Sequence, residues 1–122
     1  MGKEEGPIMQ RAEKGYEPSK VLTSFHIHGF QHWDGALVLD QLKPGIVLEL
    51  VVEPDNPYDP QAVALYLGAT KLGYVPADQN ALFATMLHFG HADAFSVRVL
   101  QVDSEAAPWK QVRVSICVND VR

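Results

Sequence analysis

The fold of this chain is most constrained by a polar, proline-rich stretch between two apolar runs, Glu53-Pro54-Asp55-Asn56-Pro57-Tyr58-Asp59-Pro60-Gln61-Ala62-Val63. Each proline fixes its own φ and keeps the residue before it out of the helical region, which predicts a rigid loop. Asp55, Asn56 and Asp59 have side chains that close Asx-turns on the backbone. Tyr58 is then expected to point outward or across the mouth of the fold. Such a loop is typical of a recognition site, but it is also compatible with a purely structural turn.

The remainder of the chain predicts strands around this loop. Alternating polar and apolar residues, separated by Gly and Pro turns, predict six strands at residues 21–30, 46–52, 62–67, 71–75, 94–102 and 111–118. Gly73, inside the fourth run, indicates a bulge or the close approach of another backbone. One helix is expected over residues 76–89, with Asp78 as N-cap, Gly90 as C-terminal stop and a buried stripe of Leu82, Phe83, Met86 and Leu87. The fold class is therefore mainly β, a small antiparallel barrel or half-barrel with one main α-helix.

Length and charge limit the function classes. The 122 residues predict one domain over residues 21–122, after a flexible N-terminal tail over residues 1–20. The net charge of −5 argues against a broad basic surface for duplex DNA. The single cysteine, Cys117, excludes a disulfide framework and a zinc site built from cysteines. No apolar run is long enough for a membrane helix and no signal-type segment is visible, so a cytoplasmic protein with no membrane association is expected.

Four motifs in order resemble the HIRAN domain family: Gly29-Phe30-Gln31-His32-Trp33-Asp34-Gly35, Leu42-Lys43-Pro44-Gly45, the stretch 53–63, and Lys71-Leu72-Gly73-Tyr74-Val75-Pro76. The resemblance runs from about Phe25 to Gly90 and is expected to continue to the end of the chain, as in a stand-alone bacterial-type member of the family. It implies a modified OB-like β-barrel. In a fork-remodelling ATPase of the family, the domain grips the free 3′-hydroxyl end of single-stranded DNA. This chain has no room for an ATPase motor, so the resemblance implies a recognition module that works in DNA repair or processing beside a helicase or nuclease partner.

The resemblance also assigns site residues. The family's end-binding Tyr-Asp pair corresponds to Tyr58, expected to stack on the terminal base, and Asp59, expected to bind the 3′-hydroxyl. Where the DNA-binding member has an Arg-Tyr pair, this chain has Gln31 and His32, and the lysine expected after the hairpin is replaced by Pro76-Ala77. The other candidate DNA-binding residues are Trp33, Asn56, Lys71 and Tyr74. Lys71, Arg98 and Arg113 are candidate phosphate contacts, or else solvated charges on strand faces.

Two other readings stay open. The missing basic residues favour a protein-interaction or small-ligand module that has lost DNA affinity. A metal site is a weaker alternative, because His26 and His28 share one strand face and His32, His88 and His91 could join them. No nucleophile lies beside a base in the sequence, so neither an enzyme nor a bound cofactor is expected. The sequence leaves the oligomeric state open.

Overall fold

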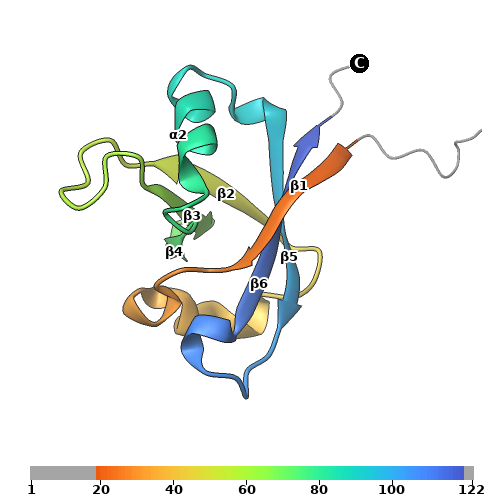
Figure 1. Cartoon of the computed structure of the whole chain (residues 1–122). Coiled ribbons are helices and arrows are strands. Elements are labelled where there is room, and N and C mark those ends of the chain that lie inside the picture. The colour runs from red at the N-terminus through yellow and green to blue at the C-terminus, as the bar shows by residue number, and fades with distance from the viewer. Residues whose placement is uncertain (1–18, 120–122) are drawn as a thin grey trace, which may run out of the picture.

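The computed structural model describes residues 19–119, and these form one antiparallel sheet with a single α-helix beside it (Figure 1). The strands are β1 (Ser19–His26), β2 (Val47–Val52), β3 (Val63–Leu67), β4 (Thr70–Tyr74), β5 (Phe95–Val102) and β6 (Val112–Asn119). They lie in the order β1-β6-β5-β2-β3-β4, and every neighbouring pair is antiparallel. The mainly β class and the six antiparallel strands are therefore confirmed.

The sheet is not closed, so the predicted OB-like barrel is not confirmed. β1 and β4 are the two edge strands, and only an isolated bridge between His28 and Tyr74 joins them among the described residues. This bridge has two backbone hydrogen bonds, each 2.9 Å long, between the amide of each residue and the carbonyl of the other. Gly29, at a φ of 73°, then turns the chain away from β4. Glycine adopts a positive φ far more readily than residues with a side chain. Gly29 therefore lets the chain turn, and the pairing with β4 ends after one residue pair.

Gly73 lies at the point where the two edges meet. A Cβ atom on this residue would be 2.5 Å from the His28 carbonyl oxygen and 2.7 Å from Ile27 Cγ2. Its φ of 147° is also rarely adopted by residues with a side chain. The β3–β4 register shifts between Leu65 and Tyr66, opposite the same residue. Both the close backbone approach and the bulge expected at Gly73 are thus present.

After Gly29 the chain forms two 3₁₀ helices, Phe30–His32 and Asp34–Gln41. The sequence predicts only a turn in the first part of this segment. Phe30 is buried, and its ring packs so closely on Gly35 that a Cβ there would overlap it. This contact folds the segment back on itself and leaves Trp33, which lies between the two helices, partly exposed.

The α-helix, α2 (Asn80–His88), begins four residues later than the predicted start at residue 76. The chain continues as an extended strand through Val75, whose amide bonds to the Val63 carbonyl, and it then makes a turn up to Gln79. Gln79, not Asp78, is the N-cap residue, and it makes no side-chain cap. Its side chain instead accepts a 2.6 Å hydrogen bond from the Thr23 hydroxyl. A tertiary contact therefore sets the start of the helix.

The buried stripe of α2 also differs from the prediction. Asn80, Phe83 and Ala84 are buried and Leu87 is half-buried, which is the i, i+3, i+4, i+7 pattern of one helix face. Leu82, expected inside, is 57% exposed. The pattern was hidden in the sequence because its first member, Asn80, is polar. Phe83 also packs edge-on against the ring of Phe95 at 5.2 Å, which attaches α2 to β5.

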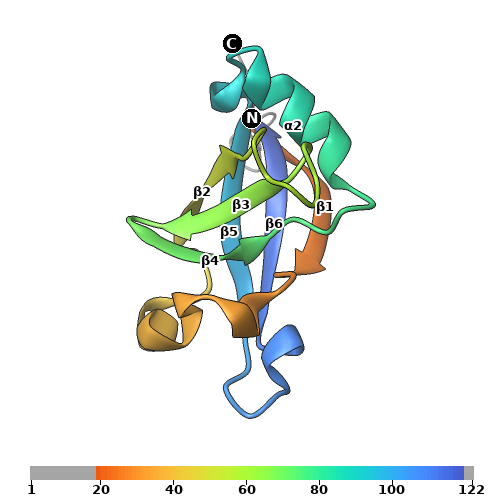
Figure 2. The same ribbon diagram turned by 90° about the vertical axis from the view of Figure 1, so that its left-hand side faces the viewer.

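The core lies between the sheet, α2 and the 3₁₀ segment. It consists of apolar side chains from the inner face of each strand and from these covering elements, namely Phe25, Ile27, Phe30, Leu42, Leu48, Val63, Leu65, Leu72, Val75, Phe83, Ala84, Val97, Val99, Val112, Val114 and Ile116. β1 begins at Ser19, inside the segment assigned to a tail, while residues 1–18 and 120–122 lie outside the described residues. α2 lies across one end of the sheet, next to the loop that joins β2 to β3 (Figure 2).

Candidate functional site

The β2–β3 loop is held in shape by Asn56. Its side-chain amide nitrogen donates to Glu53 Oε1 at 3.0 Å. Its side-chain oxygen accepts from the backbone amides of Tyr58 at 2.8 Å and Asp59 at 3.1 Å. At the base of the loop, the Glu53 amide bonds to the Ala62 carbonyl. The Asx-turn expected at Asn56 is therefore present, and the loop is held by hydrogen bonds within the protein.

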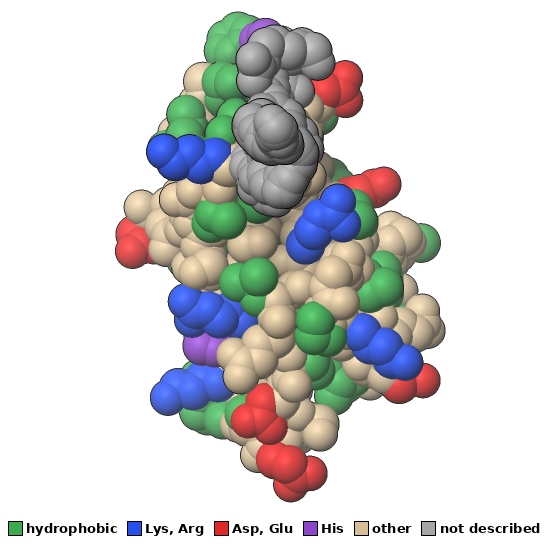
Figure 3. All heavy atoms as spheres, turned by 90° about the vertical axis from the view of Figure 1, so that its right-hand side faces the viewer, with side chains coloured by type: hydrophobic (Ala, Val, Ile, Leu, Met, Phe, Trp, Pro, Cys, Tyr) green, Lys and Arg blue, Asp and Glu red, His purple; other side chains and the backbone are tan. Residues whose placement is uncertain are grey.

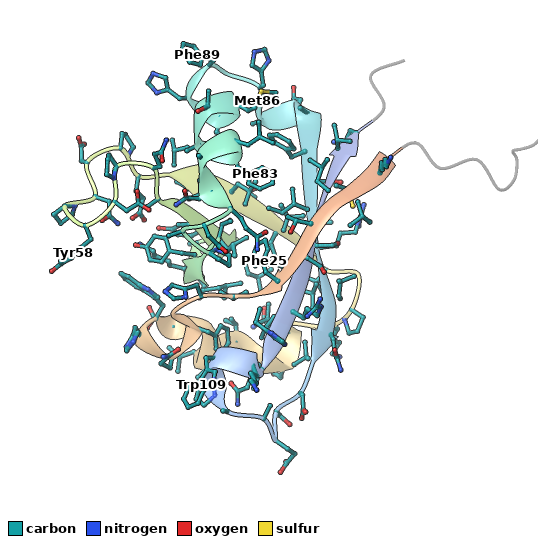
Figure 4. The ribbon with its side chains drawn as sticks, in the orientation of Figure 1. Phe25, Tyr58, Phe83, Met86, Phe89 and Trp109 are labelled. Atoms are coloured by element: carbon teal, nitrogen blue, oxygen red, sulfur yellow. The ribbon has the colours of Figure 1, made fainter. Side chains whose placement is uncertain are left out.

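Tyr58 lies at the tip of this loop. It is 94% exposed, and its side chain points away from the body of the molecule (Figure 4). Only its backbone is held, by the bond to Asn56. Both faces of the ring are therefore open for stacking.

The carboxylate of Asp59 is fixed beside it by two donors. Oδ1 accepts from the Gln61 backbone amide at 2.9 Å, and Oδ2 accepts from the side-chain amide of Asn80 at 2.9 Å. Asn80 is the first residue of α2 and is buried. The helix thus positions the carboxylate, which is only partly buried and keeps further lone pairs for a ligand donor.

Behind the loop, four side chains form a compact cluster that we call the lysine cluster: Glu53, Lys71, Tyr74 and Trp33. The Lys71 ammonium pairs with Glu53 Oε2 and donates to the Tyr74 hydroxyl at 2.6 Å. The Tyr74 hydroxyl in turn donates to Glu53 Oε1 at 2.8 Å. Lys71 Nζ also lies 3.9 Å from the centroid of the Trp33 ring, a cation–π contact. Trp33 and Tyr74 meet edge-on at 6.0 Å.

These contacts change three pKa values. Burial alone would raise the pKa of Glu53, but hydrogen bonds from Lys71, Asn56 and Tyr74 outweigh it and lower that pKa. Burial alone would lower the pKa of Lys71, but the bonds to Glu53 and Tyr74 raise it. Burial, together with the neighbouring Glu53 carboxylate, raises the pKa of Tyr74. At neutral pH the cluster therefore holds an ion pair and a neutral phenol.

The loop, the lysine cluster and the start of α2 surround a groove of about 790 Å³. Its lining is largely apolar and aromatic, and it includes Tyr58, Trp33 and Tyr74. The charged residues of the lining are three carboxylates, on Glu53, Asp55 and Asp59, and the ammonium of Lys71. The groove is therefore acidic, with a formal charge of −2.

The structure brings most of the predicted site residues together. Six of the eight line the groove, namely Trp33, Asn56, Tyr58, Asp59, Lys71 and Tyr74. Gln31 and His32 are exposed and do not line the groove. They belong to the 3₁₀ helix that follows Gly29, and this turn directs their side chains away from the groove. Lys71 is already paired with Glu53.

The other two candidate phosphate contacts also lie away from the groove. Arg98, on β5, donates to the Gly45 carbonyl at 3.3 Å, and Arg113, on β6, donates to the Ser24 hydroxyl at 2.9 Å. Lys and Arg side chains lie on the face formed by β1, β6 and β5, opposite the loop, where they are interspersed with Asp and Glu side chains (Figure 3). This mixed-charge face and the groove are therefore separate surfaces.

Four polar or charged lining residues were not among the site residues predicted from the sequence: His28, Glu53, Asp55 and Asn80. His28 lies at the groove because it pairs with Tyr74, a contact that no local pattern in the sequence signals. Glu53 opens the polar stretch but carries no signal of its pairing with Lys71, 18 residues away. Nothing local in the sequence distinguishes Asn80 from a surface residue.

The histidines do not form a metal centre with one another. Within residues 19–119, no group of three or more His, Cys, Asp or Glu side chains is placed to hold a metal ion. His28 lines the groove, whereas His88 lines a separate small cavity beside α2. No helix in the described part of the chain has the length and apolar character to span a membrane.

The comparisons with known proteins agree with this geometry. The model of the HIRAN domain family matches residues 20–119. Among solved structures, a protein from Lactobacillus plantarum superposes with a TM-score of 0.69 at 23% identity, over 84% of this chain and 96% of that one. The HIRAN domain of human HLTF superposes with a TM-score of 0.55 at 13% identity, over 84% and 82% of the two chains. No curated protein matches the sequence.

Proposed function

Because this chain belongs to the HIRAN domain family, we propose that its groove receives the free 3′-hydroxyl end of single-stranded DNA. Membership of a family of nucleic-acid-binding modules supports a DNA-binding role. The observation that carries the finer proposal is the pairing of an exposed ring, Tyr58, with a fixed carboxylate, Asp59, at the mouth of one groove. We further propose a role in DNA repair or processing, beside a helicase or nuclease partner and without catalysis by this chain itself.

The two residues supply different parts of the recognition. Stacking of the terminal base on Tyr58 contributes roughly 1–3 kcal/mol and does not depend on sequence, since every base has a π-face. The ionised Asp59 carboxylate only accepts hydrogen bonds, so it favours a hydroxyl and repels a phosphate. The Asp59 carboxylate and the backbone of Tyr58 are held by hydrogen bonds within the protein, which lowers the entropy lost on binding.

The acidic groove limits how the rest of the strand can lie. Three carboxylates face one ammonium, and that ammonium is paired with Glu53. The backbone phosphates are therefore expected to stay outside, with only the terminal nucleoside entering. Each phosphate neutralised on a single strand adds about 0.7 to the slope of log K against log salt. We expect weak binding and a slope below about 1.

The test is fluorescence anisotropy at low salt with three labelled oligonucleotides: a single strand with a free 3′-hydroxyl, the same strand with a 3′-phosphate, and a blunt duplex. Wild type should prefer the free hydroxyl, and Asp59→Asn should lose this preference because the amide no longer repels phosphate. Asp55→Asn is the matched control, since it removes the same charge from an exposed residue of the same loop. No binding to any of the three oligonucleotides would refute the proposal.

A second candidate is a module that binds a cationic or neutral partner, either a basic peptide or a small ligand. The formal charge of −2 on the groove lining favours it. If the partner is a basic peptide, its affinity should fall as the salt concentration rises, because salt screens the attraction between the peptide's positive charges and the groove. Asp55→Asn should then weaken binding as much as Asp59→Asn. For an end-binding module, only the Asp59 variant changes the preference between ends.

A further inference from the structure

Asn80 is a buried polar residue in the wall of the groove. It is 2% exposed, it is the first residue of α2, and it lines the groove together with Asp59. Its side-chain nitrogen, Nδ2, lies 2.9 Å from Asp59 Oδ2. An ionised carboxylate can only accept a hydrogen bond, so the amide nitrogen of Asn80 must face it. The amide oxygen, Oδ1, is therefore the other end of the group.

That oxygen has no hydrogen-bond partner among the described residues. Over residues 19–119, no backbone or side-chain donor makes a hydrogen bond to Asn80 Oδ1. Buried polar groups in native proteins are nearly always paired, with protein or with an ordered water molecule. A ligand in the groove is one source of the missing donor, because Asn80 lines that groove.

Asp59 is an acceptor with spare capacity at the same place. Each of its oxygens accepts one protein hydrogen bond, from the Gln61 amide and from Asn80. A carboxylate has about four lone-pair positions, so two remain. Asp59 and Asn80 thus present two neighbouring acceptors, joined by their own hydrogen bond and held by the loop and the helix.

We infer that Asp59 and Asn80 together bind two adjacent hydroxyl groups, and that the groove prefers a terminal ribose to a terminal deoxyribose. A ribose end offers a 2′- and a 3′-hydroxyl on neighbouring carbons, whereas deoxyribose offers only the 3′-hydroxyl. The 2′-hydroxyl is the group by which proteins distinguish RNA from DNA. A neutral diol also suits an acidic groove. This inference rests on the proposed function, because it requires the groove to receive a 3′ end.

The test uses wild-type protein and DNA strands that differ only in their last sugar: deoxyribose, ribose or 2′-O-methyl ribose, each with a free 3′-hydroxyl. One additional neutral hydrogen bond predicts roughly 2- to 10-fold tighter binding of the ribose end. The 2′-O-methyl end should fall to the deoxyribose affinity or below. Competition by unlabelled adenosine against 2′-deoxyadenosine distinguishes a free ribonucleoside from an RNA-type strand end as the source of the diol.

Asn80→Ala and Asn80→Ser, checked by thermal unfolding, separate ligand contact from positioning. If Asn80 only positioned Asp59, both variants would weaken all three ends by the same factor. The inference requires Asn80→Ala to remove the ribose preference itself. Should the variants not fold, the sugar series on wild type still decides. Equal affinity for ribose and deoxyribose ends, with the free hydroxyl still preferred to phosphate, overturns this inference alone, whereas loss of that second preference overturns the proposed function.

Discussion

Replacing Glu53 by Gln tests whether the lysine cluster holds the groove together. The substitution keeps the shape of the side chain but removes the charge that pairs with Lys71. The two side chains are only 22% and 14% exposed, so Lys71 would remain as a largely buried ammonium with the Tyr74 hydroxyl and the Trp33 ring as its neighbours. An ammonium in that position has few compensating contacts, and the folded state should lose stability.

The magnitude follows from the degree of burial. Exposed ion pairs contribute about 0–1 kcal/mol, and breaking a fully buried pair costs about 3–5 kcal/mol. A pair that is mostly but not wholly buried lies between, at about 1–3 kcal/mol. The free energy of unfolding from urea titrations at pH 7 measures it. Glu49→Gln is the matched control, because Glu49 is an exposed residue of β2, the strand that ends just before Glu53, and it should change stability by less than about 0.5 kcal/mol.

The pH dependence has a definite sign. The pKa of Glu53 is lower in the folded state than its ordinary value of 4.5, so its contribution is present above pH 4.5 and is lost as the pH falls through the folded value. The pKa of Lys71 is raised above 10.5, so its contribution is present below that pH and is lost as the pH rises further. The difference between wild type and Glu53→Gln should therefore shrink in acid. A difference that stays constant down to pH 3, or that equals the Glu49→Gln value, would refute this reasoning.

Two further predictions follow from the loop and the sheet edge. Gly73→Ala should destabilise the fold by about 2–5 kcal/mol in urea unfolding, because the new Cβ collides with the His28 carbonyl and the φ is unfavourable. Gly68→Ala is the control: a Cβ there would meet no atom within 4 Å, so the substitution should cost only about 1–2 kcal/mol. Tyr58→Ala should leave the melting temperature unchanged because the side chain is 94% exposed, yet it should weaken binding of a 3′-hydroxyl strand by roughly 1–3 kcal/mol. Tyr58→Phe keeps the ring and should bind like wild type, and a Tyr58→Ala variant that binds equally well would exclude stacking.

Strands with one buried face, such as β2, could be predicted because a period of two is visible in the sequence. Leu48 is buried while Val47 and Glu49 on either side are exposed, as the alternation requires. The loop could also be predicted, since prolines and Asx side chains act through local geometry. The Asn56 bonds reach only two and three residues along the chain.

Features that depend on distant contacts could not be predicted. At the start of α2, Gln79 is held by the Thr23–Gln79 hydrogen bond, which spans 56 residues of sequence. The buried stripe was hard to recognise because it begins with the polar residue Asn80, which is buried where it donates a hydrogen bond to Asp59. Closure of the sheet also depends on a distant contact, namely how far the chain after β1 continues beside β4. Gly29 ends that pairing after His28.

The same difference between local and distant contacts explains why only part of the site could be predicted from the sequence. The stretch 53–63 marks one wall of the groove through its composition alone. The opposite wall is made by Lys71 and Tyr74, both on β4, together with Trp33, which comes beside them after the His28–Tyr74 bridge brings the two sheet edges together. The charge balance of the groove could not be read from the sequence, because it depends on the pairing of Lys71 with Glu53.

The most direct test of the central claim is an NMR titration with a short single strand that has a free 3′-hydroxyl. The Tyr58 loop of the groove and the mixed-charge face of β1, β6 and β5 lie on opposite sides of the molecule, so the shifted signals identify which surface binds (Figures 3 and 4). If the groove receives the strand end, the backbone amides of Tyr58 and Asp59 and the indole of Trp33 should shift most. Shifts confined to β1, β5 and β6, around Arg98 and Arg113, would contradict the account.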